Sequence, residues 1–426
     1  MTVRIQSVSG SRVTLELTID LKDSMLGSEE AILAGTNEVG CALTGLALKA
    51  FDTDGRTIEQ GGQRWHTKGQ QPKTYQTPYG DVSIKRHVYQ RSGGGKTFCP
   101  LEHDARIILT STPQFCRQVS WKMAYGGARD VQQDLLNHGR PFQVYAIQRL
   151  AEAVSAVVQA KEEEWDYAPP AELDDQVHTV SVGLDGTCML MCERHWREAM
   201  TGTVALYNRE GERLYTMYLG ATPEYGKATF PARLTREVER MKARYPEATF
   251  VGVADGTQSN WDYLADHVSV QVLDFYHASG YLGAAATATY PADAGKRRLW
   301  LKEMCHQLKH TTGAAGHLLR IMQTLQQDET LNEKQQEDLQ KSITYYQNHQ
   351  HQMNYPGYQQ QQLPIGSGVT EAACKTLIKQ RLCRSGMRWK DKGARVILSL
   401  RELALTPVRW QQFWDKLSDQ GLSVAV

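Results

Sequence analysis

Two aspartates follow nearly identical stretches of the chain, and carboxylates placed in this way can do metal chemistry. The segment VSVGLDGT contains Asp185 and the segment FVGVADGTQSNW contains Asp255, each after a run of mostly apolar residues that is typical of a buried β-strand. If both strands end at the same edge of one sheet, the two carboxylates lie close together and raise each other's pKa. A glutamate from a helix packed against that edge would complete a cluster of three.

Glu371 is the candidate for the third carboxylate. A Gly-Ser-Gly loop leads into a helix at this point, and Ser367 is its expected N-cap. Spacing alone favours Glu371 only weakly over Glu303 or Glu329, so the choice also depends on the basic residues that follow it. For either aspartate alone, an Asp-Gly turn after a strand is the structural alternative, and the repeated pattern is what favours a shared site.

Three carboxylates predict a site for hard divalent cations, Mg²⁺ or Mn²⁺. Two such ions, about 3.5–4 Å apart, can activate an attacking hydroxyl and stabilise the leaving oxygen of a phosphodiester. The expected metal ligands are therefore Asp185, Asp255 and Glu371, with two Mg²⁺ ions as the cofactor.

The chain after Glu371 is strongly basic, with Asp391 as the single acid between Lys375 and Arg401. Such a run can bind DNA phosphates, and tryptophans beside it can pack or stack on bases, Trp410 among them. A solvated charged face is the alternative. The DNA-binding candidates are Lys375, Lys379, Arg381, Arg384, Arg388, Trp389 and Lys390.

The elements that must position these residues form an α/β pattern. From Val177 three strands follow one another, the last two joined by a tight REGE turn, so an antiparallel meander is expected. Helix, strand, helix and strand come next. This order is that of a ribonuclease-H-like mixed sheet, although order alone does not exclude other α/β sheets.

The remaining chain predicts an α+β region, a tri-helical unit and a long helical insertion into the sheet domain. The tri-helical unit is compatible with a DNA-binding helix-turn-helix, and a helical bundle that only packs is an equal alternative. A short strand is expected at ARIILT. The expected divisions are 1–112 (α+β), 113–160 (tri-helical), 161–176 (linker), 177–283 (core, first part), 284–363 (all-α insertion) and 364–426 (closing helix and basic segment).

Length, charge and cysteine usage set the class of protein. A chain of 426 residues is too long for one ordinary core, and a formal net charge of +1 neither favours nor excludes nucleic acid as a partner. Eight scattered cysteines predict free thiols in a reducing cytoplasm. The N-terminus has no apolar h-region, and no apolar run approaches eighteen residues, so neither a signal peptide nor a membrane span is expected.

Other sites of known chemistry match the sequence poorly. Cys188, Cys192 and His195 lack a second Cys/His pair at zinc spacing. The GGGKTF segment lacks the spacing of a phosphate-binding loop, and no G-x-S-x-G motif is present.

Several longer segments make the chain resemble a known family. They include TPYGDVSIKRHVYQ, SWKMAYGGARDVQQDL, HWREAMTGTVALYNREGERL, PIGSGVTEAACK and SGMRWK. Together with the two aspartate segments they resemble the DDE transposases of bacterial insertion sequences, in the ISKra group, which is related to the Mutator-like superfamily. The resemblance covers most of the chain. It differs at the N-terminus, where a paired-cysteine element is expected and only Cys99 stands near TFCPLEH.

The resemblance implies roles for particular residues. Asp185 and Asp255 would be the two catalytic aspartates and Glu371 the catalytic glutamate. DFYH matches a family signature with Asp274 and His277, for which support of the metal site, DNA contact and simple structural pairing remain open.

The resemblance also implies an activity and partners. The chain would hydrolyse phosphodiesters at the terminal inverted repeats of an element and join the 3′-hydroxyl to target DNA. A homodimer or higher oligomer is expected, because two DNA ends must be brought together. The alternatives are a domesticated DNA-binding relative that no longer cleaves, and a ribonuclease-H-like nuclease without strand transfer.

Overall fold

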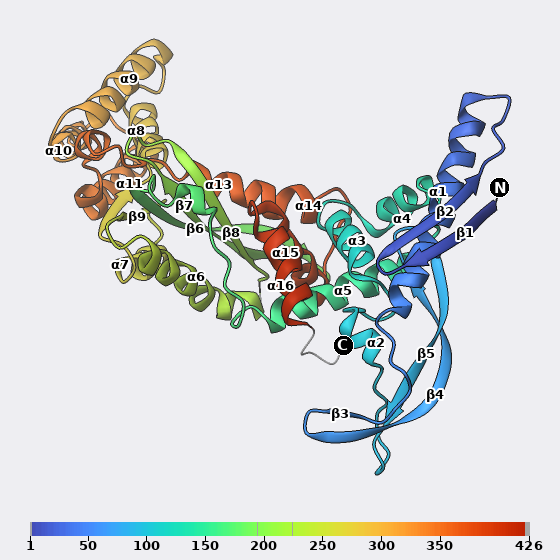
Figure 1. Ribbon diagram of the computed structural model, residues 1–426. Helices are drawn as coiled ribbons and strands as arrows, with labels where there is room; N and C mark the ends of the chain where they lie inside the picture. Colours follow the sequence, from blue (N-terminus) through green and yellow to red (C-terminus); the bar gives the residue numbers. More distant parts are fainter. Residues whose placement is uncertain (1, 194, 224, 422–426) are drawn as a thin grey trace. The chain divides into compact units, whose positions relative to one another are not determined.

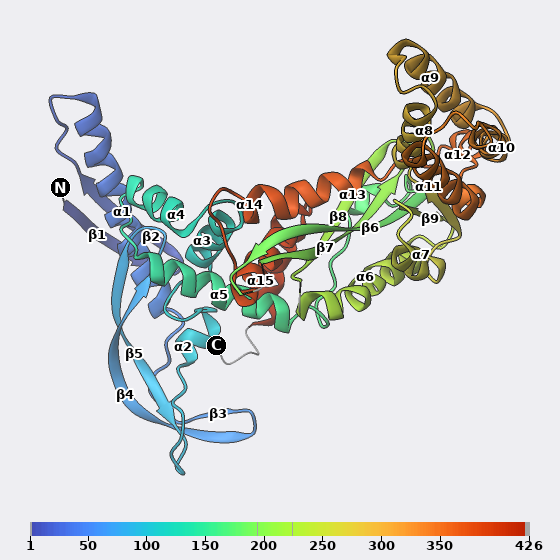
Figure 2. The same ribbon diagram turned by 180° about the vertical axis from the view of Figure 1, so that it is seen from behind.

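The computed structural model describes residues 2–193, 195–223 and 225–421, leaving out the side chains of residues 225–227. The chain divides into two compact units (Figures 1 and 2). Unit 1 comprises Met1–Tyr167, Ser399–Ala404 and Arg409–Val426, and unit 2 comprises Ala168–Leu398 and Leu405–Val408. The first boundary falls inside the segment predicted to be a linker, where Trp165 is buried against Phe413.

Unit 1 combines two small antiparallel sheets with helices. The β1–β2 hairpin forms one sheet and β3, β4 and β5 form the other. The elements are β1 (Thr2–Ser9), β2 (Arg12–Thr18), α1 (Met25–Lys49), β3 (Ile58–Gln60), β4 (Gln63–Gln76), β5 (Asp81–Gln90), α2 (Pro100–Asp104), α3 (Pro113–Tyr125), α4 (Ala128–Asn137), α5 (Val144–Ala160) and α16 (Arg409–Gln420). The two strands around the Pro-Tyr-Gly-Asp turn are confirmed as β4 and β5. The strand predicted at ARIILT is wrong, because Ile108 and Ser111 form only an isolated bridge across a tight turn.

The three helices predicted between 114 and 159 are α3, α4 and α5. Their apolar positions recur at helical spacing and are buried, as Val119 on α3 and Ile147 and Val154 on α5 illustrate. Trp410 on α16 is also buried, with its ring 5.2 Å from that of Trp121 on α3. Trp410 therefore packs within unit 1, and a DNA-binding role for α3–α5 stays a prediction.

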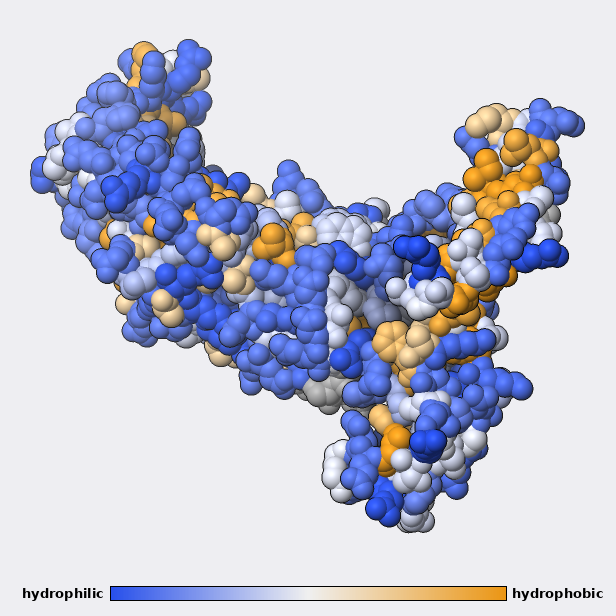
Figure 3. Space-filling model, in the orientation of Figure 1, coloured by the Kyte–Doolittle hydropathy of each residue, from blue (hydrophilic) through white to orange (hydrophobic). Residues whose placement is uncertain are grey.

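The sequence predicts no membrane span, and among the described residues one helix could cross a membrane by the simplest measures. Helix α1 is long and apolar enough to do so by length and composition, with 17% of its apolar window buried. It is nevertheless built into unit 1, because Leu48 packs with Tyr75 and Val82 in a small core. Much of its remaining apolar surface is exposed, including Met25, Leu26 and Ile32, and Figure 3 shows this surface in orange. None of the eight cysteines is in a disulfide, as predicted.

Unit 2 is built on an open, mixed sheet of five strands in the order β10-β9-β6-β7-β8. The strands are β6 (Thr179–Met191), β7 (His195–Tyr207), β8 (Arg213–Ala221), β9 (Thr249–Ala254) and β10 (Val270–Leu273). β6, β7 and β8 form the predicted antiparallel meander, while β9 and β10 run parallel to β6. Buried Val, Leu, Met and Phe side chains make these strands near-continuous apolar runs, as expected for a sheet covered on both faces.

Helices cover both faces of the sheet (Figures 1 and 2). Gly202 on β7 faces Phe230 and Leu234 of α6 (Tyr225–Arg244). The next residue, Thr203, faces the opposite side and meets Thr370 of α13 (Gly368–Ala373), since successive side chains of a strand alternate. After α13 come a π-helical turn (Cys374–Lys379), α14 (Gln380–Leu382) and α15 (Asp391–Leu405).

The chain between β10 and α13 is almost wholly helical, and this includes the predicted helical interval from Ala284 to Gln362. Its elements are α8 (Phe275–Thr289), α9 (Ala294–His310), α10 (Ala314–Gln326), α11 (Glu333–His349) and α12 (Tyr355–Gln360), and α7 (Gln258–Ala265) precedes β10. Figures 1 and 2 show α8–α12 gathered at one end of the sheet. α11 packs on α8 there, with the Tyr346 hydroxyl donating to Ala278 O at 3.1 Å.

Candidate functional site

Asp185 and Asp255 occupy equivalent positions on neighbouring parallel strands. The pairing of β6 with β9 joins Thr179 to Thr249 and ends at Val182 and Gly252, a constant offset of seventy residues (249 − 179 = 252 − 182 = 70). Asp185 and Asp255 have the same offset (255 − 185 = 70) and both lie three residues beyond the last pair. The two carboxylates therefore lie at one level, beyond the edge of the parallel pairing.

The expectation that both strands end at their aspartates is wrong for Asp185. β6 continues to Met191, and Asp185 pairs with Thr201 of β7. Asp255 does follow the last residue of β9. Gly256 then adopts φ 103°, a conformation that favours glycine, and Asp255 Oδ1 accepts the Thr257 N–H at 3.0 Å. The hydrogen bond between Asp255 and Thr257 is thus one that an ordinary Asp-Gly turn explains.

Close packing of α13 on the sheet brings Glu371 to the face of β6 that carries Asp185. A Cβ atom at Gly183 would lie 2.1 Å from Thr370 Oγ1, so α13 can approach β6 only over a glycine. Thr370 also hydrogen-bonds Thr203 at 2.8 Å. Asp185 lies two residues after Gly183 and shares its face of the strand. Asp185 and Glu371 line one pocket of about 590 Å³, together with Cys374, Lys375 and Lys379.

The Asp185 carboxylate is held in a half-buried, electrically unfavourable position. Burial raises its pKa above the usual range, and the charges of Asp255 and Glu371 raise it further. Among the described residues, only the Gly186 N–H, at 2.7 Å, and the Cys374 thiol, at 3.5 Å, donate to it. Across residues 2–193, 195–223 and 225–421, no lysine, arginine or histidine forms an ion pair with Asp185 or Asp255. A divalent cation would supply the missing charge, so the residues fit Mg²⁺ or Mn²⁺.

Asn260 ties the two aspartate segments together. Its amide, on the buried face of α7, donates to Leu184 O at 3.3 Å and lies 3.5 Å from Asp255 Oδ1. Asn260 is not among the site residues that the sequence predicts. Its position in DGTQSN, in the first turn of a helix that starts shortly after an aspartate, is a weak signal that many structural asparagines share.

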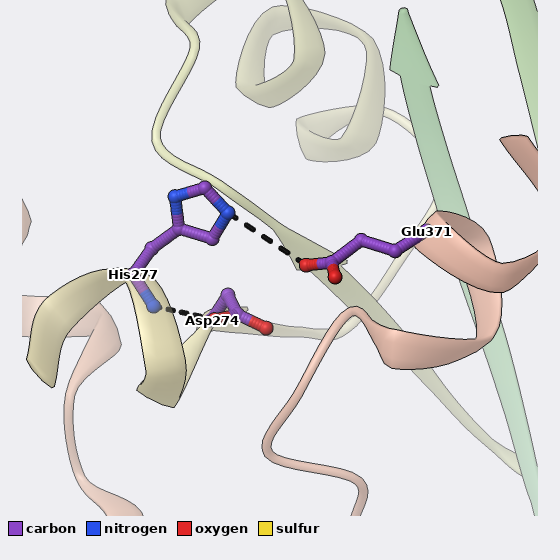
Figure 4. A group of neighbouring side chains, drawn as sticks. All are labelled: Asp274, His277 and Glu371. Atoms are coloured by element: carbon purple, nitrogen blue, oxygen red, sulfur yellow. Dashed lines mark hydrogen bonds and ion pairs between the residues drawn. The ribbon is translucent and has the colours of Figure 1, made fainter. Parts of the chain in front are cut away.

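A second group of polar side chains surrounds Glu371 (Figure 4). Asp274 is fully buried and accepts the N–H of His277 on Oδ1 at 2.7 Å and that of Ser367 on Oδ2. The Ser367 hydroxyl lies 2.8 Å from Asp274 Oδ2 and 2.9 Å from Glu371 Oε1. His277 Nε2 lies 3.7 Å from Glu371 Oε1.

These contacts indicate that Asp274 has a structural role, whereas Glu371 is a candidate metal ligand. Ligand atoms of Asp274, His277 and Glu371 all lie within 4.8 Å of one another, which is close enough for a shared ion. Both oxygens of Asp274, however, already accept N–H donors, so this residue clamps the start of α8 to the loop before α13. Ser367 is the N-cap residue of α13, as predicted, but its hydroxyl makes no capping hydrogen bond and turns toward the two carboxylates instead.

The basic candidates do not all lie at the surface. Lys375 and Lys379 are exposed and line the Asp185 pocket, and Arg384, Arg388 and Lys390 are exposed as well. Arg381 is buried, with its guanidinium 5.5 Å from the centre of the Trp389 ring. The Trp389 indole donates to Leu382 O at 2.7 Å. The structure thus uses Arg381 and Trp389 in packing, and DNA contacts by either stay predictions.

The weak zinc alternative gains no support. Cys188 and Cys192 are exposed, and within the described part of the chain they form no group of possible metal ligands with His195.

Comparison with models of known protein families and with curated protein sequences gave no match.

Proposed function

We propose that the chain is a metal-dependent DNA transposase with a ribonuclease-H-like catalytic core. The observation that carries this proposal is that Asp185 and Asp255 lie at one level beyond the β6–β9 pairing and that Asp185 shares a pocket with Glu371, without a basic partner for either aspartate among the described residues. Three hard oxygen ligands beside two lysines match the charge pattern that phosphodiester chemistry requires.

The topology of unit 2 supports the fold part of the proposal. Three antiparallel strands are followed by two strands parallel to the first, in the order third, second, first, fourth, fifth. This is the order expected for a ribonuclease-H-like sheet. The helices α8–α12 interrupt the chain between the fifth strand and α13, where the helical insertion was predicted.

Asp185, Asp255 and Glu371 would hold the divalent cations. When bound, such ions make an attacking hydroxyl more nucleophilic and stabilise the leaving oxygen. Lys375 and Lys379 would neutralise the phosphates that flank the cleaved bond, since both line the same pocket. Ser367 and His277 would orient Glu371 through their contacts with Oε1.

The further parts of the proposal follow from the family resemblance. The substrates would be the terminal inverted repeats of a bacterial insertion sequence and target DNA. The helices α3–α5 and the basic segment would hold DNA, and two or more copies would act together in the cytoplasm.

Cleavage and strand transfer test the proposal. The substrate is a linear duplex containing the DNA that flanks the coding gene on both sides, incubated with the protein and Mg²⁺. We expect Asp185→Asn, Asp255→Asn and Glu371→Gln to lose roughly 100-fold or more in cleavage. The matched controls Asp262→Asn and Glu303→Gln, both exposed, should retain full activity.

Three other results of this assay would each contradict a part of the proposal. Full activity in one of the three variants would remove that residue from the metal site. Cleavage without joined products would indicate a nuclease. Tight DNA binding that Mg²⁺ does not change, without cleavage, would indicate a relative that only binds DNA.

A further inference from the structure

Glu371 lies between two pockets, one lined mainly by charged and polar side chains and the other by aromatic and small residues. On one side is the pocket with Asp185, Lys375 and Lys379. On the other is an open pocket of about 450 Å³ lined by Tyr276, His277, Gly280, Tyr281, Ala284 and Glu371. The pocket with the proposed metal ligands and two lysines shares Glu371 with the aromatic pocket, and together they match the two halves of a nucleotide, the phosphate and the base.

The floor of the aromatic pocket is formed by two small residues on α8, Gly280 and Ala284, that follow Tyr276. Tyr276, Gly280 and Ala284 follow at intervals of four and therefore lie on one face of the helix. Within 4 Å, a Cβ atom at Gly280 would meet nothing, so the floor is open. A flat ring can therefore lie against α8 here.

The two tyrosines are held in place around this floor. Tyr276 is 72% exposed, and one edge of its ring packs over Gly366, in the loop that leads to Glu371. Tyr281 stacks on Tyr345, with ring centroids 3.7 Å apart and an angle of 16°. The Tyr345 hydroxyl donates to Asp255 O at 2.7 Å, which connects the aromatic pair to the aspartate turn. An exposed aromatic ring beside fixed polar groups is how proteins stack unpaired bases.

We infer that this aromatic pocket binds an unpaired nucleobase of the DNA strand whose phosphate lies at Asp185 and Glu371. The inference depends on the proposed function, since it takes DNA as the ligand. Tyr276 would stack on the base, and His277 would contact its edge. Sequence would matter little, because every base offers a planar face.

Binding of short single strands tests this inference. The probes are a fluorescein-labelled eight-nucleotide strand of thymidylates and a strand of the same length in which every base is absent, both in Ca²⁺ to allow binding without Mg²⁺. The phosphates are the same, so the difference in Kd between the probes measures contacts to bases. The test variant is Gly280→Leu, which fills the floor of the pocket and replaces glycine with a better helix former.

We expect Gly280→Leu to weaken binding of the thymidylate strand by about 5- to 100-fold and to leave the abasic strand unchanged. Tyr276→Ala should act in the same direction. The control Thr287→Leu adds a similar side chain to an exposed position two turns further along α8 and should behave as wild type.

Two results would overturn the inference in distinguishable ways. If Gly280→Leu binds the thymidylate strand within twofold of wild type, the pocket takes no base, while the proposed function stands. If the wild-type protein binds neither strand, the proposed function fails as well.

Discussion

The hydroxyl of Ser367 lies 2.9 Å from Oε1 of Glu371, one helical turn further along the chain. A serine hydroxyl carries one proton, and Asp274 Oδ2 on its other side already accepts the Ser367 N–H. Asp274 Oδ2 at 2.8 Å and Glu371 Oε1 at 2.9 Å both face this single proton, so the Ser367 hydroxyl links the two carboxylates and holds Glu371 in place.

Ser367→Ala should consequently weaken binding of a divalent cation more than it weakens folding. We expect the Kd for Mn²⁺, measured by titration calorimetry, to rise about tenfold, in line with the loss of a supporting contact to a metal ligand. Ser399→Ala removes a buried serine–serine hydrogen bond in unit 1 and should cost similar stability without changing the Kd. An equal change of Kd in both variants would assign Ser367 a purely structural role.

Asp274→Asn should destabilise unit 2, because one amide oxygen cannot replace both carboxylate oxygens. Either the His277 N–H or the Ser367 N–H then faces an NH₂ group. We expect a loss of about 1–3 kcal/mol in the free energy of unfolding, measured with urea. Unchanged stability would show that Asp274 does not clamp α8 to the loop before α13.

Gly183→Ala should push α13 away from β6, since the new Cβ would lie 2.1 Å from Thr370 Oγ1. Overpacking of this kind costs about 1–3 kcal/mol. The double variant Gly183→Ala, Thr370→Ala removes the clashing oxygen and should recover part of the stability and of the DNA cleavage. The free energy of unfolding would be measured with urea for Gly183→Ala, Thr370→Ala and the double variant. If the two single losses simply add up in the double variant, the predicted contact is contradicted.

The Asp185 carboxylate should make the metal-free protein less stable as pH rises. Its pKa is raised in the folded state, so the folded chain binds more protons than the unfolded chain above the unfolded pKa of about 3.9. Stability is then lost between that value and the raised folded pKa. In EDTA at pH 7, Asp185→Asn should melt roughly 1–3 °C above wild type.

Mg²⁺ should reverse this order of melting temperatures. The ion binds the folded wild type and stabilises it, whereas Asp185→Asn lacks a ligand. A wild-type melting temperature that Mg²⁺ leaves unchanged would indicate that Asp185 has another role.

The strands of unit 2 were predictable because each is an apolar run between turn signals. The aspartate pair could be found for the same reason, as two similar runs end in Asp-Gly. Apolar patterns do not record how far a strand continues past its pairing with one neighbour, so the extension of β6 to Met191 was missed.

The contacts around Glu371 could not be predicted from local sequence. Ser367 has the residue type and position of an N-cap, and only a buried carboxylate ninety-three residues earlier draws its side chain away. Likewise, nothing in the pattern near Asn260 indicates that its amide reaches Leu184. Hydrogen bonds between distant segments depend on packing that periodicity does not encode.

Anomalous scattering from crystals soaked in MnCl₂ would locate the ion directly. We expect a peak about 2.0–2.6 Å from carboxylate oxygens of Asp185, Asp255 and Glu371, and no such peak in Asp185→Asn crystals. A peak bound only by His277 and Glu371, or no peak beside Asp185, would contradict a metal site shared by the three carboxylates.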